Sequence, residues 1–151
     1  MNLLGALLSR PRKYTGSGTN HEAEQFNGVL EVQPLVEQTA ILLHYVAMRV
    51  DGLHLHREST LVGLDAHGQP CLWPVMEELP LVLAHTQLTY TAPGADTHVW
   101  VFSSGPRDVT ESFREEITIE LGPKGRLIYA HAWGMPGATF AQRSRCELLP
   151  A

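Results

Sequence analysis

Short runs of β-forming residues, separated by turn residues, follow one another from Gly28 to the end of the chain. The expected strands are 28–35, 39–50, 53–64, 71–75, 81–91, 97–103, 113–121, 126–133 and 139–148. This spacing favours a sandwich or a barrel over βαβ units. We therefore predict an all-β fold, a closed antiparallel up-and-down β-barrel of about 8–10 strands, because closure removes the exposed edges of a sheet.

The chain has 151 residues, the length of one domain, and we take residues 1–151 as a single calycin-like barrel domain. Residues 1–20 are expected to form a short N-terminal helix and a loop. Asn2 can cap a helix over 2–8, and Pro11 would stop it. Such a helix would plug the barrel or cover a sheet edge.

Asp51 and Gly52 separate two long β-rich runs and predict a two-residue type I′ turn. In the register that follows, Tyr45 faces Glu58 and Ala47 faces His56. This face becomes apolar away from the turn, as the wall of a binding cavity would. We therefore expect it to line the barrel, although the opposite face, which carries Met48, Leu55, Leu42 and Leu61, is the more apolar near the turn.

A second hairpin is predicted at residues 122–125, after a strand in which Ile117 and Ile119 alternate with charged side chains. A loop of even length would place Ala130 and Ala132 on the apolar side. It would place Tyr129, His131 and Trp133 on the charged side. Arg143 and Arg145 would share that wet face and form cross-strand ion pairs there.

Residues Tyr14-Thr15-Gly16-Ser17-Gly18 and His56-Arg57-Glu58 form two short motifs. They resemble elements of the calycin superfamily of lipocalin-like and fatty-acid-binding-protein-like barrels, and within it of nitrobindin-like domains. The first is similar to the second half of a G-x-W-x-G-x-G element, with Tyr in place of Trp, and the second to an H-R-E element. The resemblance implies a cavity for a small, largely apolar ligand. It also implies a haem-ligating histidine on one of the last strands, but no histidine follows His131, so we expect no haem.

His54, His56 and Glu58 alternate along one expected strand and could converge on a metal ion. Cupin barrels use a similar pattern but add a histidine from a second motif, and residues 134–137 offer none. We therefore expect no tightly held metal and no cofactor. A solvated polar rim beside the turn is the commonest explanation of such a pattern. The functional alternative, which we adopt, has Tyr45, His56 and Glu58 as the polar ligand-binding groups of an apolar cavity.

Charge and hydropathy limit the partners. A net charge of −5 argues against nucleic acid, because phosphate binding depends on Lys and Arg. No run approaches the roughly 18 apolar residues of a membrane helix, and basic residues follow the apolar run 3–8 instead of preceding it, which is the wrong order for a secretion signal. We therefore expect a soluble cytoplasmic protein. Cys71 and Cys146 lie far apart in the sequence and are expected to be buried free thiols.

Together these features predict a non-enzymatic barrel that binds a small apolar ligand. One alternative is an isomerase or hydratase that uses His56 and Glu58 as an acid–base pair. Another is an interaction module whose barrel is filled by side chains. Trp100 is expected in the core, whereas Trp133 would cap the barrel or mark an interface, in which case the protein could be a homodimer.

Overall fold

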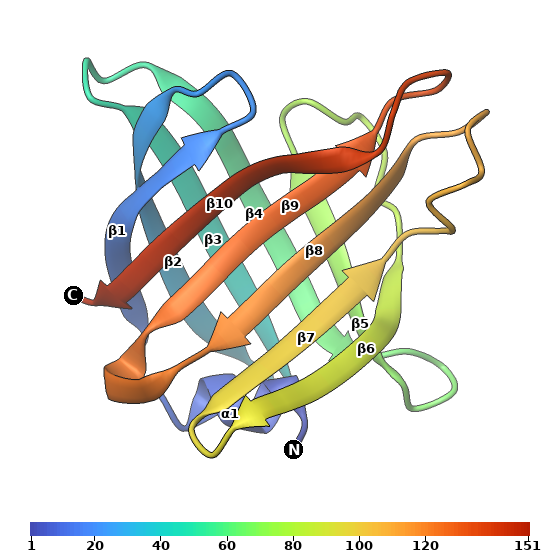
Figure 1. Cartoon of the computed structure of the whole chain (residues 1–151). Coiled ribbons are helices and arrows are strands. Elements are labelled where there is room, and N and C mark those ends of the chain that lie inside the picture. The colour runs from blue at the N-terminus through green and yellow to red at the C-terminus, as the bar shows by residue number, and fades with distance from the viewer.

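The computed structural model describes residues 1–151 as a closed antiparallel β-barrel with one short α-helix (Figure 1). The strands are β1 (Lys13–Asn20), β2 (Gln25–Leu35), β3 (Ala40–Arg49), β4 (His54–Leu64), β5 (Pro70–Met76), β6 (His85–Gly94), β7 (Thr97–Ser103), β8 (Arg114–Leu121), β9 (Leu127–Gly134) and β10 (Ala141–Pro150). Each strand pairs with its neighbours in sequence, and β1 pairs with β10 to close the barrel. The predicted up-and-down barrel is confirmed.

Most expected strands agree with the structure to within a few residues, and β7 has the predicted bounds. The largest shift is in β6, expected from residue 81 and observed from His85. Strand β1 was not expected at all, because residues 13–20 were taken as loop. Its sequence lacks an apolar alternation, and Tyr14 is its only fully buried side chain. It is a strand because both of its edges are paired in the closed barrel.

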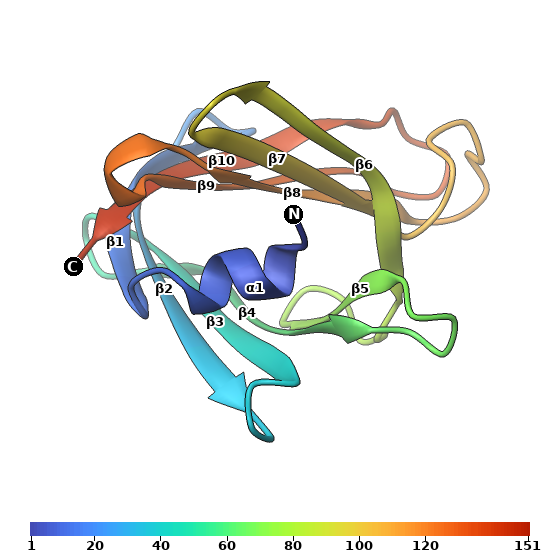
Figure 2. The same cartoon turned by 90° about the horizontal axis from the view of Figure 1, so that it is seen from below.

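Helix α1 (Leu3–Leu8) plugs one end of the barrel. The side chain of Asn2 accepts a hydrogen bond from the backbone N–H of Gly5 at 2.7 Å, so Asn2 is the expected N-cap. Leu3 and Leu7 are buried in the main apolar cluster. Figure 2 shows the helix lying across the barrel opening. No helix of the structure is long and apolar enough to cross a membrane.

The turn between β3 and β4 has three residues, not the predicted two. Gly52 N–H donates to the carbonyl of Arg49, and Arg49 N–H donates to the carbonyl of Leu53, both at 2.9 Å. Only Gly52, at φ 90°, has positive φ, so the turn is not type I′. A β-bulge at Leu55 then shifts the pairing back by one residue. As a result, Ala47 pairs with His56 and Tyr45 with Glu58, as predicted.

Gly52→Val is expected to destabilise the protein by about 1–2 kcal/mol, because valine is strained at positive φ. A side chain at position 52 would meet no neighbouring atom, so the cost is conformational alone. Gly105→Val is the matched control, since Gly105 also has open space but no positive φ. Urea denaturation of both variants measures the difference. Equal stabilities would contradict the role assigned to this turn.

The hairpin between β8 and β9 differs from the prediction, and the difference changes the site. Leu121 pairs with Leu127, so the loop contains residues 122–126, an odd number. Lys124 and Gly125 both adopt positive φ within it. Tyr129 and His131 consequently face the interior, opposite Ile119 and Ile117, and both are buried. The prediction that placed them on the charged outer face was wrong.

The prediction that Arg143 and Arg145 share the wet face of β10 was wrong for Arg143, because the pairing of β10 with β9 shifts at that residue. Cys146 pairs with Tyr129 and Ser144 with His131, whereas Arg145 pairs with Ala130 on the outer face. The register shift separates the two arginines, and Arg145 contacts Glu147 on its own strand, so the expected cross-strand ion pairs do not form. Glu116 instead pairs with Arg107.

The apolar core occupies the barrel interior beside α1. Its largest fully buried members include Trp100, Phe102, Tyr14 and Tyr129. Trp100 is thus in the core, as predicted. Cys71 and Cys146 are buried free thiols, also as predicted.

Candidate functional site

A pocket of about 240 Å³ opens into the barrel interior. Its lining comes from the ends of β1, β3, β5 and β9, from the starts of β2, β4, β8 and β10, and from the connections between them. This is the end of the barrel opposite α1 (Figure 1). The apolar lining residues are Phe26, Tyr45, Ala47, Leu55, Met76, Leu79, Phe113, Trp133 and Met135. The barrel is therefore hollow at one end and filled at the other.

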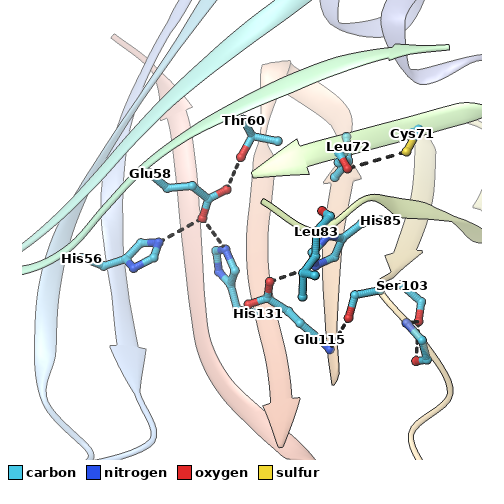
Figure 3. Close-up of polar contacts among 12 residues, drawn as sticks. His56, Glu58, Thr60, Cys71, Leu72, Leu83, His85, Ser103, Glu115 and His131 are labelled. Atoms are coloured by element: carbon cyan, nitrogen blue, oxygen red, sulfur yellow. Dashed lines mark hydrogen bonds and ion pairs between the residues drawn. The ribbon is translucent and has the colours of Figure 1, made fainter. Parts of the chain in front are cut away.

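Glu58 lies at the centre of a buried polar network behind this pocket, and its side chain has no solvent exposure. Its Oε2 accepts hydrogen bonds from His56 Nε2 at 2.9 Å and His131 Nε2 at 2.8 Å (Figure 3). Its Oε1 accepts from the hydroxyls of Thr60 and Tyr129. Both carboxylate oxygens are therefore satisfied by two donors each, as a buried charge requires.

The hydrogen bonds of this network favour an ionised Glu58 and a protonated His56. Burial opposes ionisation of Glu58, but the nearby charge of His131 and the hydrogen bonds from both histidines outweigh it and hold the pKa of the carboxyl well below its usual range. Burial also opposes a charged His56, yet hydrogen bonds to Glu58 and Glu78 raise its pKa to about 10. His56 lies between two carboxylates, which accept hydrogen bonds only, so both of its ring nitrogens carry protons.

All three residues singled out from the sequence lie inside the barrel. Counting backbone and side chain together, Tyr45 is 2% exposed and Glu58 is 4% exposed, so this face of the β3–β4 hairpin points inward. The ring of Tyr45 packs 5.9 Å from that of His56 and 4.9 Å from that of Tyr129. Tyr45 and His56 line the pocket directly, whereas Glu58 lies behind them.

His54 does not join this cluster. The bulge at Leu55 turns His54 to the outer surface, where it is exposed, and turns Leu55 toward the pocket instead of the outer face expected for it. The His54–His56–Glu58 pattern considered for a metal therefore does not converge. A bulge of one residue leaves no clear mark in the sequence.

His131 and Tyr129 complete the site, and sequence analysis missed both. They lie on β9, across the barrel from β4, and their inward direction depends on the odd length of the 122–126 loop. The only signal in the sequence was Gly125, which permits positive φ in the loop. Nothing indicated that Lys124 would adopt positive φ as well.

Aromatic and basic side chains frame the mouth of the pocket. The guanidinium of Arg143 lies 4.5 Å from the ring of Trp133, and Phe113 and His21 pack against the same ring. The buried guanidinium of Arg114 donates to backbone carbonyls on both neighbouring loops, including those of Arg107 and Met135. Trp133 thus lies at the barrel mouth, the first of the two positions expected for it.

A second buried pair, His85 and Glu115, lies in the barrel wall. His85 Nε2 donates to Glu115 at 2.9 Å, and His85 Nδ1 lies 2.9 Å from the carbonyl of Leu83 (Figure 3). Glu115 also lines the pocket. This pair links β6 to β8 beside the pocket.

The residues of β10 do not fit a haem bound through the last strands. The side chains of β10 that line the pocket are Arg143 and Ser144, and neither is a usual haem ligand. The Arg143 guanidinium donates hydrogen bonds to the backbone carbonyls of Trp133 and Thr139. The other possible haem ligand on β10, the thiol of Cys146, is fully buried opposite Tyr129 and does not line the pocket. Strand β10 therefore offers no axial ligand for a haem iron.

Comparison with known proteins supports the fold. No protein-family model matches the chain, and no curated protein matches it. Among solved structures, the crystal structure of Rv2717c from M. tuberculosis is similar, with a TM-score of 0.73 and 17% sequence identity. The match covers 98% of this chain and 96% of that one. At this identity the likeness shows the closed barrel fold alone.

Proposed function

We propose that this protein binds a small, largely apolar molecule in the pocket at the open end of the barrel. The observation that carries the proposal is the pocket itself. Its aromatic and aliphatic walls, to which the Tyr45 ring belongs, converge on a few polar groups, among them His56 and His131, which is the usual composition of small-molecule sites. Glu58 does not line the pocket, but its hydrogen bond to His56 Nε2 fixes the orientation and charge of that ring.

Membership of the calycin superfamily belongs to the same proposal. The Tyr14–Gly18 segment forms the closing strand β1, and His56 and Glu58 of the second motif face the interior. Both positions suit barrels of that type, which enclose ligands between side chains of their strands.

The pocket favours binding over acid–base catalysis by His56 and Glu58. An acid–base pair needs a group that can exchange a proton with the substrate. Glu58 does not line the pocket, and four donors already occupy its oxygens. The isomerase or hydratase alternative therefore has less support.

Filling the pocket tests this proposal. Ala47 is buried and lines the pocket, so Ala47→Phe should occupy the space and weaken binding of the apolar dye anilinonaphthalene sulfonate by about tenfold. Ala130→Phe is the control, because Ala130 lies on the outer face of β9 between the inward Tyr129 and His131. Fluorescence titration gives the affinities, and a cooperative thermal melt shows that each variant is folded. Equal dye affinity in the wild type and both folded variants would refute the pocket as the binding site.

A further inference from the structure

Three potential metal ligands converge at the inner end of the pocket. His56, Glu58 and His131 each present one ligand atom, and these atoms all lie within 4.8 Å of one another. We infer that they form a binding site for one divalent transition-metal ion, such as Zn²⁺ or Fe²⁺. This inference goes beyond the apolar pocket and does not depend on it.

The spacing of the ligand atoms suits coordination. Glu58 Oε2 lies 2.9 Å from His56 Nε2 and 2.8 Å from His131 Nε2. Adjacent ligands around an ion with bonds of roughly 2.1 Å are separated by about 3 Å at the right angle of an octahedral site and by about 3.4 Å at the tetrahedral angle of zinc. A metal ion would replace the two ring protons that now point at Oε2. The two imidazole rings and the carboxylate would turn so that their lone pairs point at the ion.

Each of the three side chains also makes a hydrogen bond through its other polar atom, as ligands of metal sites usually do. The other carboxylate oxygen of Glu58 accepts from Thr60 and Tyr129, which leaves Oε2 as the single ligand atom. His56 Nδ1 donates to the Glu78 carboxylate at 3.0 Å, and His131 Nδ1 lies 3.4 Å from the Ser144 hydroxyl. These contacts direct Nε2 of both rings toward Glu58.

The arrangement leaves coordination positions open on one side. His56 and His131 line the pocket, whereas Glu58 closes the opposite side. Two imidazoles and one carboxylate with open positions form the ligand set of catalytic zinc sites and of non-haem iron sites, not of closed structural sites. A pocket ligand with an oxygen donor could then bind the ion directly.

Sequence analysis predicted no metal because His54, His56 and Glu58 lacked a further histidine. In the structure His54 points away from the other two residues, and His131 of β9 takes its place as the third potential ligand. The prediction considered only histidines close to Glu58 in the sequence, whereas the potential ligands in the structure are His56, Glu58 and His131.

The test uses the full chain, freed of metal with EDTA and titrated with Zn²⁺ by calorimetry and with Co²⁺ by visible absorption. We expect one equivalent bound at micromolar affinity or tighter. Glu78 is half-exposed, so Glu78→Gln should leave the fold intact and weaken Zn²⁺ binding roughly 10- to 100-fold. His131→Gln should abolish the site, and His54→Gln, at the exposed histidine nearest to the site in sequence, should change nothing.

Any of three results would overturn the inference. The first is no stoichiometric binding by the folded wild type, which would make the cluster a hydrogen-bonded network alone. The second is unchanged affinity in Glu78→Gln. The third is loss of binding in His54→Gln, which would place the metal on the surface. Dye binding by the metal-free wild type is measured in parallel, so failure of this site and failure of the apolar pocket are distinguishable.

Discussion

Glu58→Gln is expected to lower the free energy of unfolding by about 3–5 kcal/mol, the cost of breaking a buried ionic network by changing one member. Glutamine offers one carbonyl oxygen in place of two carboxylate oxygens. Its amide N–H groups would face the hydroxyls of Thr60 and Tyr129 or the Nε2 atoms of both histidines. The charge of His56 would also lose its buried partner.

Glu78→Gln is the matched control for this change. Glu78 contacts the same histidine from the solvent side, and half of its side chain is exposed. Its replacement should change stability by less than about 1 kcal/mol. Urea denaturation monitored by circular dichroism gives both values. Equal, small effects of the two substitutions would contradict the central position assigned to Glu58.

Gly16→Ala is expected to destabilise the barrel by about 3 kcal/mol, the upper part of the range for overpacking. Gly16 lies in β1 beside β10, the pair that closes the barrel. A Cβ atom there would come within 1.9 Å of the backbone oxygen of Glu147, and a backbone atom cannot swing aside as a side chain can. One of the two strands would have to shift.

Ser17→Ala provides the comparison, because Ser17 lies next to Gly16 in the same strand and is exposed. It should alter stability by less than about 0.5 kcal/mol. If thermal melts of Gly16→Ala and Ser17→Ala coincided with the wild type, the close approach of β1 to β10 would be wrong.

The fold was predictable because alternation of apolar and polar residues and turn residues mark most strands. The strand that this pattern missed, β1, is rich in glycine and polar residues and is stabilised by its two neighbours. Its structure therefore depends on barrel closure, which no local pattern reports.

The site was predictable only where pairing followed from a short turn. Tyr45, His56 and Glu58 were placed on the inner face although the turn was wrong, because the bulge at Leu55 compensated for the extra turn residue. His131 was missed because a loop longer by one residue shifts the register of the next strand, and each of its side chains then points to the opposite face of the sheet.

The central claim is that the open end of the barrel holds a small molecule. Native mass spectrometry of the protein purified from its own host tests it most directly, with the wild type and Ala47→Phe prepared side by side. The account predicts a retained organic molecule, one per chain, on the wild type and its loss from the folded variant. A wild-type mass equal to that of the chain alone, or the same adduct on both proteins, would contradict it.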